Sequence, residues 1–327
     1  MRNAIPPIGL FGKLPSHPDF IRLNAGSPLA RAIDQWFQEG MSSLRLQVGD
    51  GWESVFDRAV PVFFVYRDRD ASSALVGVSR PSRDQTGRRY PFSIFSHVQL
   101  GRNGKEFHVL PMAYARFLKA ARRMLETDCA DGIDNAKAAR VMNLASTLPQ
   151  NLVEFETKFN HFVGQTTMES FWQTLFPEFH DQRKYLVIKN LFSALVPRRG
   201  QDSSRFTFSL HLPTAAGMDA VVEQIGVWCS LCRGALGGKG LEQASVFWHA
   251  DAAPPARGCY LYFRPPTPMS VTNLFVPGWE DGSLLFVDLQ GAENMNTARD
   301  DLGERLAGAL DERASGLKDF IKAIAAG

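Results

Sequence analysis

The sequence predicts a mixed α/β (α+β) fold, in which a group of antiparallel strands is followed by a helical stretch and a second α/β part. Short β-branched and aromatic runs at 59–68, 73–82 and 90–100 are typical of strands. Because only a few charged or small residues separate the first two runs, an antiparallel meander is their simplest connection. Helical patterns then dominate until about residue 197, and strand-like runs return after it.

The first 48 residues predict a strand, a loop and a long helix. Residues 9–20 begin as a short strand and continue as a loop, since Pro15 and Pro18 exclude a regular helix. Ser27 is a good helix N-cap, and Pro28 suits the first helical position. The helix that follows has apolar residues at helical spacing, namely Leu29, Ile33, Trp36 and Phe37.

The rest of the chain predicts helices, a linker and further strands. Helices are expected over 111–126, over 134–148 and in three segments between 150 and 197, before a polar linker at 197–204. A strand, a helix over 218–236 and three short strands follow. One apolar stripe then predicts a single long amphipathic helix at the C-terminus, through Leu302, Leu306, Leu310, Leu317, Phe320, Ile321 and Ile324. We therefore expect three parts, over residues 1–130, 131–200 and 201–327.

Composition excludes several classes of protein. Of 327 residues, 45% are hydrophobic and 21% are charged, which is typical of a globular chain with a sizeable core. A net charge of +2 does not indicate a nucleic-acid-binding protein. The N-terminus lacks the apolar stretch of a signal peptide, and no apolar run is long enough to span a bilayer. We expect a soluble, cytoplasmic protein without a disulfide framework, since it has only four cysteines.

Two local patterns suggest cofactor or redox chemistry but fit it poorly. Cys229 and Cys232 form a CxxC pair late in a predicted helix, where the helix dipole disfavours a thiolate. We therefore expect two small buried side chains, with a thiol-redox role as the weaker alternative. The glycine-rich run at 234–240 closes that helix instead of opening one, and it ends in Lys-Gly, so it predicts a helix C-cap and not a phosphate-binding loop. We expect no cofactor and no metal.

No catalytic constellation is evident in the sequence. The seven histidines are scattered and include no HxxxH or HxH pair. Ser16, His17 and Asp19 are close in sequence, but neighbours in a loop point in different directions, and a triad is built from residues distant in sequence.

An arginine-rich loop at 79–92 is the more informative polar segment. Arg80, Arg83, Arg88 and Arg89 surround Asp84 there. Guanidinium groups bind carboxylates and phosphates with two parallel hydrogen bonds, so the loop could bind an anionic or acidic partner. The alternative is a solvated loop whose arginines pair with Asp84 and other acids of the chain.

Two motifs resemble those of the TagF (ImpM) family of accessory proteins of bacterial type VI secretion. The first is GLFGKLPSHPDFI at 9–21, and the second is RPSRDQTGRRYPF at 80–92. Between them lie the helix with Trp36 and the pair Gly51-Trp52, and the resemblance covers residues 9 to about 125. Pro18 stands where the family usually has Gly, so the turn and the use of its backbone amides are expected to differ.

The resemblance implies a mostly antiparallel sheet flanked by helices and a protein that is not an enzyme. It implies a post-translational negative regulator that binds the cytoplasmic forkhead-associated (Fha-type) scaffold protein of the secretion apparatus. No nucleic acid and no membrane insertion are expected. The alternative from another class is a small hydrolase or phosphotransferase that uses Asp19, Asp84 and the nearby arginines.

Because both motifs combine turn-forming residues with charges of both signs, we expect them to meet on one face of the molecule. The hypothesis is a single polar surface cluster that binds a partner and consists of Lys13, Ser16, Asp19, Arg80, Asp84 and Arg88. In this hypothesis Lys13 and Asp19 hold the first turn or join the arginine-rich loop through charge-assisted hydrogen bonds.

Overall fold

The computed structural model describes residues 7–68, 72–101, 104–253, 257–276, 278–279 and 281–326. A mixed α/β fold is confirmed, with one mostly antiparallel sheet of nine strands in the described part of the chain. The strands are Ile8–Gly12 (β1), Ile21–Leu23 (β2), Val62–Tyr66 (β3), Ser73–Arg80 (β4), Phe92–Gln99 (β5), Ser209–Pro213 (β6), Ser245–Trp248 (β7), Gly258–Tyr262 (β8) and Leu284–Phe286 (β9).

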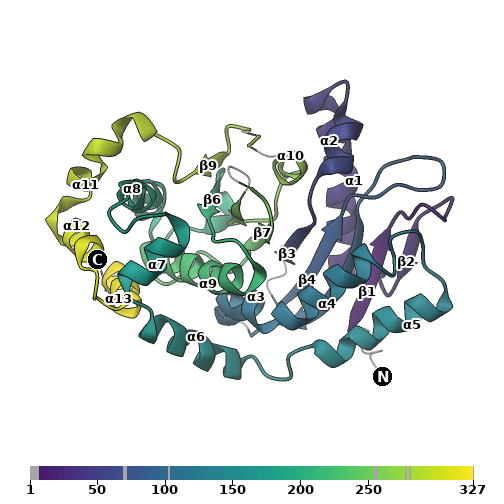
Figure 1. Cartoon of the computed structure of the whole chain (residues 1–327), viewed down its shortest axis with the longest axis horizontal. Coiled ribbons are helices and arrows are strands. Elements are labelled where there is room, and N and C mark those ends of the chain that lie inside the picture. The colour runs from purple at the N-terminus through teal and green to yellow at the C-terminus, as the bar shows by residue number, and fades with distance from the viewer. Residues whose placement is uncertain are drawn as a thin grey trace.

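The strand order is β2-β1-β5-β4-β3-β7-β8-β6-β9. The expected meander is confirmed, since β3 pairs with β4 and β4 with β5, both antiparallel. The sheet continues across the sequence, because β3 pairs with β7 and places Phe64 opposite Phe247. Only β9 runs parallel to its neighbour, β6. Strands from residues 8–99 and from residues 209–286 therefore form one continuous layer (Figure 1).

Helices cover both faces of this sheet. They are Pro28–Val48 (α1), Trp52–Arg58 (α2), Leu110–Ala113 (α3), Ala115–Glu126 (α4), Asn135–Asn143 (α5), Val153–Gln165 (α6), Met168–Leu175 (α7), Arg183–Leu195 (α8), Met218–Ala235 (α9), Ser270–Phe275 (α10), Ala298–Asp301 (α11), Gly303–Asp311 (α12) and Leu317–Ala326 (α13). Short 3₁₀ helices span Lys105–Val109 (η1), Leu144–Thr147 (η2), Val196–Arg198 (η3), Ser203–Arg205 (η4) and Ala292–Thr297 (η5).

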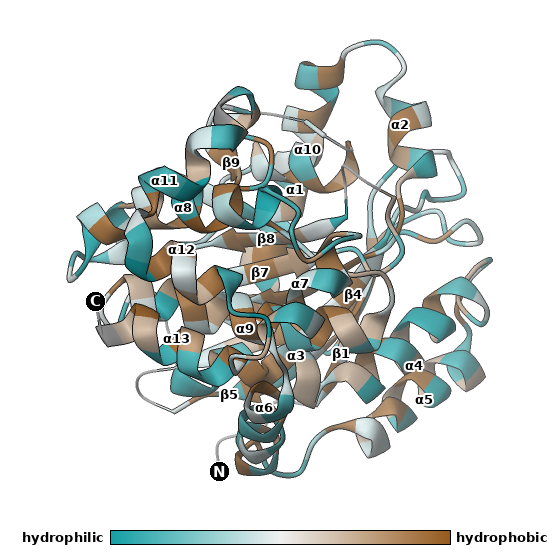
Figure 2. Ribbon diagram, turned by 60° about the vertical axis from the view of Figure 1, so that its left-hand side comes forward, coloured by the Kyte–Doolittle hydropathy of each residue, from teal (hydrophilic) through white to brown (hydrophobic). Residues whose placement is uncertain are grey.

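Alternate residues of the central strands point into two separate cores. In β3, Phe63 and Val65 pack with α4 and α9, whereas Val62 and Phe64 pack with α1, α2 and α10. Because every residue of β3 is buried, the strand is apolar on both faces. Teal and brown residues alternate along α4 and α5 in Figure 2, as expected for helices with one face on a core.

The start of α1 confirms the prediction made from its cap. The hydroxyl of Ser27 accepts a hydrogen bond from the Ala30 amide at 3.0 Å, and Pro28 is the first helical residue. An N-cap hydroxyl satisfies one of the amides that the first helical turn leaves without a partner. The helix then buries the apolar stripe at Leu29, Ile33, Trp36 and Phe37.

The prediction of a single long helix at the C-terminus is wrong. The segment forms α11, α12 and α13, and α12 ends where Glu312 adopts an extended backbone with ψ of 92°. The chain then pairs with the start of α7, because the Leu317 amide donates to the Thr166 carbonyl at 2.9 Å. The apolar stripe is real, since Leu310, Leu317 and Ile324 are buried, but two helices with a break between them provide it.

Candidate functional site

The first predicted motif begins at the end of β1, where Gly12 has a positive φ of 131°. A Cβ atom at Gly12 would lie 2.2 Å from the carbonyl oxygen of Pro91, so only glycine fits between β1 and the entry to β5. This close approach brings Lys13 beneath the loop between β4 and β5. The Lys13 side chain is buried there, with 8% of it exposed.

The second motif forms a small hairpin between β4 and β5. The Tyr90 amide donates to the Ser82 carbonyl at 2.9 Å, and the Asp84 amide donates to the Arg88 carbonyl at 3.1 Å. The turn closes at Gly87, whose φ of 86° favours glycine. The predicted pivot at Gly87 is therefore confirmed.

The carboxylate of Asp84 lies at the centre of this hairpin and is completely buried. One oxygen, Oδ2, accepts from Lys13 Nζ at 2.9 Å and from Arg88 Nε at 2.7 Å. The other, Oδ1, accepts from the Thr86 amide at 3.0 Å, the Thr86 hydroxyl at 2.7 Å and the Arg88 amide at 2.9 Å. We call these four residues, Lys13, Asp84, Thr86 and Arg88, the Asp84 cluster.

Burial alone would raise the pKa of Asp84, because it disfavours the charged carboxylate. The hydrogen bonds from Lys13, Thr86 and Arg88 outweigh burial and hold the pKa of Asp84 well below its ordinary value. A carboxylate with five donors has no lone pair directed at solvent, so Asp84 organises the loop and does not present an acid to a ligand.

The first motif closes over the second through its backbone. The Arg88 guanidinium donates to the Pro18 carbonyl at 2.7 Å, and the Gln85 amide donates to the His17 carbonyl at 2.9 Å. The first loop thus contributes carbonyl oxygens to these contacts, as the proline at position 18 permits. The Phe20 ring completes the junction, with its centroid 4.7 Å from that of Tyr90 and 5.0 Å from Lys13 Nζ.

A third segment, residues 129–132 between α4 and α5, joins the two motifs. The Ser16 amide donates to the Asp131 carbonyl at 3.1 Å. The Arg80 guanidinium donates to the carbonyls of Cys129 and Ala130 at 3.1 and 3.0 Å. Gly132 packs directly on Ser16, so a Cβ atom there would collide with the serine hydroxyl. The sequence offered no signal for this segment, because carbonyl oxygens are common to all residues.

The six predicted site residues therefore fall into three sets. Lys13, Asp84 and Arg88 are in direct contact. Ser16 and Arg80 meet through the 129–132 segment. Asp19 is exposed and accepts a hydrogen bond from the amide of its own neighbour, Phe20, at 2.8 Å, so it joins neither set.

Sequence reasoning left Arg83, Gln85 and Thr86 out of the predicted site. Thr86 donates two hydrogen bonds to the Asp84 carboxylate. Its position could have indicated this, because an aspartate in a turn often binds the backbone two residues further on. Arg83 and Gln85 are exposed on the same hairpin. Arg83 makes no side-chain hydrogen bond or ion pair within the described residues, so its charge is directed to solvent.

The hairpin is also fixed to the helices beside it. Arg89 pairs with Asp57 and Glu53 of α2, at 2.8 Å in each case. The Tyr90 hydroxyl donates to the Asp34 carboxylate of α1 at 2.6 Å. The loop therefore presents its exposed side chains from a backbone held on several sides.

Asp34 also lines a cavity of about 530 Å³ between β2 and α1, together with Arg22, Arg31 and Gln38.

The cysteine pair is buried in the body of α9, and Cys229 and Cys232 are at most 1% exposed. Burial raises the pKa of Cys229 to about 12 and that of Cys232 well above its ordinary value. Both are free thiols, as are Cys129 and Cys259. The expectation of two small buried side chains is confirmed.

Within the described part of the chain, no group of three or more histidine, cysteine or acidic side chains could hold a metal ion. None of the helices in that part is both long and apolar enough to cross a membrane.

Comparisons with known proteins agree with the two motifs. Residues 9–144 match the TagF N-terminal domain, described as type VI secretion system-associated. The crystal structure of PA0076 from Pseudomonas aeruginosa PAO1 is similar at 16% identity and a TM-score of 0.47, over 84% of this chain and 96% of that one. No curated protein matches the chain. The matched region contains both motifs, the Asp84 cluster and the 129–132 segment, so residues 9–144 of this chain form a TagF N-terminal domain, as the two motifs indicated.

Proposed function

We propose that this protein is a cytoplasmic, non-enzymatic negative regulator of type VI secretion that binds an Fha-type scaffold protein of the apparatus. The TagF N-terminal domain supports the link to type VI secretion. The inhibitory role and the partner are inferred from the family resemblance. The structural observation that supports binding is the hairpin at 82–90, which holds arginine side chains on a fixed surface.

Arg83 and Arg88 are the cations that this surface offers to a partner. The Arg88 side chain is 58% exposed, although its guanidinium is held by the Asp84 carboxylate and the Pro18 carbonyl. Arg83 is exposed beside it. A guanidinium fixed in advance loses little conformational entropy on binding, and its planar shape suits carboxylate or phosphate oxygens. The surface therefore fits an acidic or phosphorylated face of the scaffold.

The test is co-elution of the purified protein with the purified scaffold, followed by titration calorimetry. Arg83→Gln should weaken the complex at least about tenfold, since a charge-assisted contact contributes about 1.5–3 kcal/mol. Arg45→Gln is the matched control, because Arg45 is an exposed arginine in the last turn of α1. Failure of the scaffold to co-elute, or equal affinity of the Arg83→Gln variant and the unmodified protein, would contradict the proposal.

The enzyme alternative relies on Asp19, Asp84 and the arginines. Asp84 is a poor general base, because its two oxygens already accept five hydrogen bonds and its pKa is depressed. Asp19 is the accessible carboxylate, so Asp19→Asn tests this alternative without disturbing the hairpin. Turnover of a phosphatase or nucleotidase substrate that disappears in this variant would establish an enzyme.

A further inference from the structure

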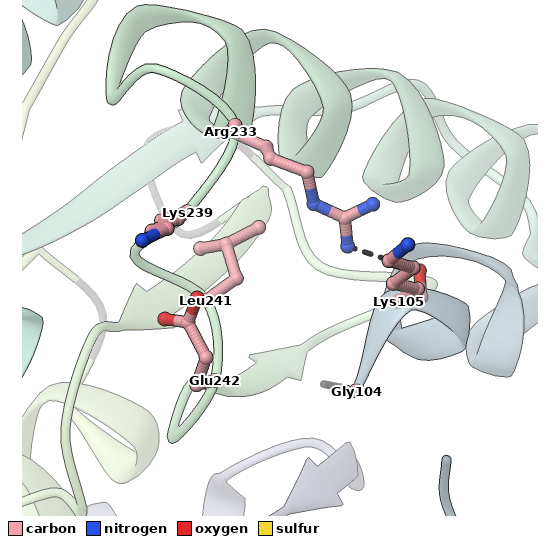
Figure 3. A pocket seen from close by; sticks show the side chains of 7 residues that line it. Gly104, Lys105, Arg233, Lys239, Leu241 and Glu242 are labelled. Carbon is pink, nitrogen blue, oxygen red and sulfur yellow. Dashed lines mark hydrogen bonds between the residues drawn. The ribbon is translucent and has the colours of Figure 1, made fainter. Parts of the chain in front are cut away.

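A second polar hollow contains none of the residues of the Asp84 cluster. It has a volume of about 520 Å³, within the range of small-molecule sites, and lies between η1 and the C-terminal turn of α9. Its lining, drawn in Figure 3, consists of Gly104, Lys105, Arg233, Gly238, Lys239, Leu241 and Glu242. Three of these seven residues are cationic: Lys105 belongs to η1, Arg233 to the last turn of α9, and Lys239 to the glycine-rich turn that follows α9.

The three cations are not needed to bind the last carbonyl groups of α9. Lysine and arginine are common near helix C-termini because the last carbonyls lack partners. Here other donors already occupy them: the Gly238 amide binds the Arg233 carbonyl at 2.8 Å, and the Gly237 amide binds the Gly234 carbonyl at 2.9 Å. The Gly200 amide binds the carbonyl of Leu236 at 3.3 Å. This confirms the predicted glycine C-cap and leaves the cations available for another purpose.

The three cations of the hollow are not engaged in ion pairs with the acids that the structure describes. Within the described residues, Lys105, Arg233 and Lys239 form no ion pair. Figure 3 shows the Arg233 side chain extended toward Lys105, whose backbone carbonyl it binds at 3.0 Å. Glu242 is the single acid in the lining, and its carboxylate accepts the Gly240 amide at 2.8 Å. Among the described residues of the lining, three cations and one carboxylate give a net charge of +2, which matches a dianion.

The wall behind the hollow is built tightly around a further arginine. Arg67 is completely buried, and it donates to the carbonyl of Leu241 at 2.9 Å. A Cβ atom at Gly104 would lie 2.7 Å from its guanidinium, so the chain passes directly over Arg67 only because residue 104 is glycine. The backbone on both sides of the hollow is therefore fixed, and the three outer cations project from it.

We propose that this hollow binds a small phosphate-bearing molecule, with Lys105, Arg233 and Lys239 as its cationic ligands. A phosphate monoester carries close to two negative charges at neutral pH and has several acceptor oxygens. The guanidinium of Arg233 can bind two of those oxygens, whereas the two ammonium groups act as mobile point charges at the rim. The lining residues that the structure describes include no aromatic ring for a base to stack on, so the phosphate group itself is what the site recognises.

The experiment is titration calorimetry of the full chain with inorganic pyrophosphate in a buffer without phosphate. We expect saturable binding at one site that weakens between about 0.05 and 0.5 M salt, because exposed charges are screened. The double variant Lys105→Gln and Lys239→Gln should bind at least about tenfold more weakly. Lys318→Gln is the control, since Lys318 is exposed on α13, and it should bind like the unmodified protein.

Malonate provides the test of ligand class, because it is a dianion of carboxylates. Affinity for malonate equal to that for pyrophosphate would overturn the assignment to phosphate. The proposed site would be overturned by any of three results. These are no saturable binding of pyrophosphate, an affinity that does not depend on salt, and a double variant that binds pyrophosphate as tightly as the unmodified protein. Thermal denaturation of the double variant checks its folding, and the salt series on the unmodified protein remains decisive if that variant is unstable.

Discussion

The indole Nε1 of Trp36 donates a hydrogen bond to the backbone carbonyl of Thr267, which lies 231 residues later in the chain, at 2.8 Å. The same indole packs against Phe247 of β7, with ring centroids 5.1 Å apart. Gly40, one turn further along α1, touches Val271 of α10 so closely that a Cβ atom would lie 2.1 Å from its side chain. The helix α1 of the TagF domain thus forms one core with residues 247–271, which lie outside that domain.

Because the core is shared, we expect that the TagF domain does not fold stably when it is separated from the rest of the chain. A fragment that ends at residue 144 loses β7 and α10, so the apolar strand β3 keeps unpaired backbone groups on one side. We expect the fragment to aggregate or to melt without cooperativity, whereas the full chain melts cooperatively. Size-exclusion chromatography and calorimetry measure this, and a monomeric fragment with a sharp transition would instead support the predicted boundaries at 130 and 200.

Replacing Asp84 with Asn should destabilise the protein in a pH-dependent manner. The pKa of Asp84 is lower in the folded chain, so the carboxylate stabilises the fold above its unfolded pKa of about 4 and this contribution is lost as the pH falls further. Leaving Lys13 buried without its anion should cost about 3 kcal/mol of unfolding free energy near neutral pH. Urea denaturation at neutral and acidic pH should show a large difference that shrinks in acid.

The control for this measurement is Asp50→Asn, because Asp50 is exposed in the turn before α2. A loss of stability at Asp84 no larger than the loss at Asp50 would contradict the central position assigned to the Asp84 carboxylate.

Gly12→Ala should cost about 3 kcal/mol, since the new methyl group meets the Pro91 carbonyl and the positive φ is strained for alanine. Gly26→Ala is the matched change, because nothing lies within 4 Å of a Cβ atom there. Chemical denaturation of the two variants should separate them clearly. Equal stability would mean that β1 does not need glycine at its end.

His211→Phe should make the protein more resistant to acid. The His211 ring is buried between Tyr260 and Phe286, and neither ring nitrogen has a hydrogen-bond partner within the described residues. Burial, aided by the nearby His249, lowers the pKa of His211 to about 3. Because the unfolded histidine binds a proton below about pH 6.5 and the folded one does not, stability falls by up to about 1.4 kcal/mol per pH unit on acidification.

The phenylalanine variant cannot take up this proton, so its stability curve between about pH 6.5 and 4 should be flatter. His161→Gln, an exposed change on α6, should keep the slope of the unmodified protein. Identical slopes for all three proteins would show that His211 is not the group responsible.

The cysteines should be unreactive in the folded protein. All four are buried, and burial raises the pKa of Cys129, Cys229, Cys232 and Cys259. Thiol titration with a disulfide reagent should therefore label none of them until denaturant is added, whereas Ser42→Cys on the exposed face of α1 should react at once. Rapid native labelling of Cys229 or Cys232 would revive the thiol-redox alternative.

Local signals predicted local structure well. Ser27 and Pro28 start α1 because the cap and the fixed φ of proline act within one turn, and the glycine run after α9 ends that helix for an equally local reason. The prediction of one C-terminal helix failed because a contact with a distant part of the chain interrupts it. The break after Asp311 depends on a contact with Thr166 that no periodicity in the last 30 residues could reveal.

The candidate site was predictable only in part. The contact of Lys13, Asp84 and Arg88 was predictable because the two motifs combine turn-forming residues with charges of both signs, but the burial of Asp84 was not predicted. Asp19 has the same chemistry but an exposed position, which depends on how the loop turns after Pro18. The hollow beside α9 was not predicted because Lys105 lies 128 residues before Arg233 in the sequence, and folding alone brings it beside Arg233 and Lys239.

The two edge strands of the nine-stranded sheet, β2 (Ile21–Leu23) and β9 (Leu284–Phe286), are each three residues long. Such short terminal strands offer an extended peptide very few main-chain groups with which to pair. Recognition by strand addition, which many signalling modules use, is therefore poorly suited to this protein. We therefore expect side chains to make most of the contacts with a partner, so single substitutions on the surface should change which partner binds, whereas backbone pairing would tolerate them.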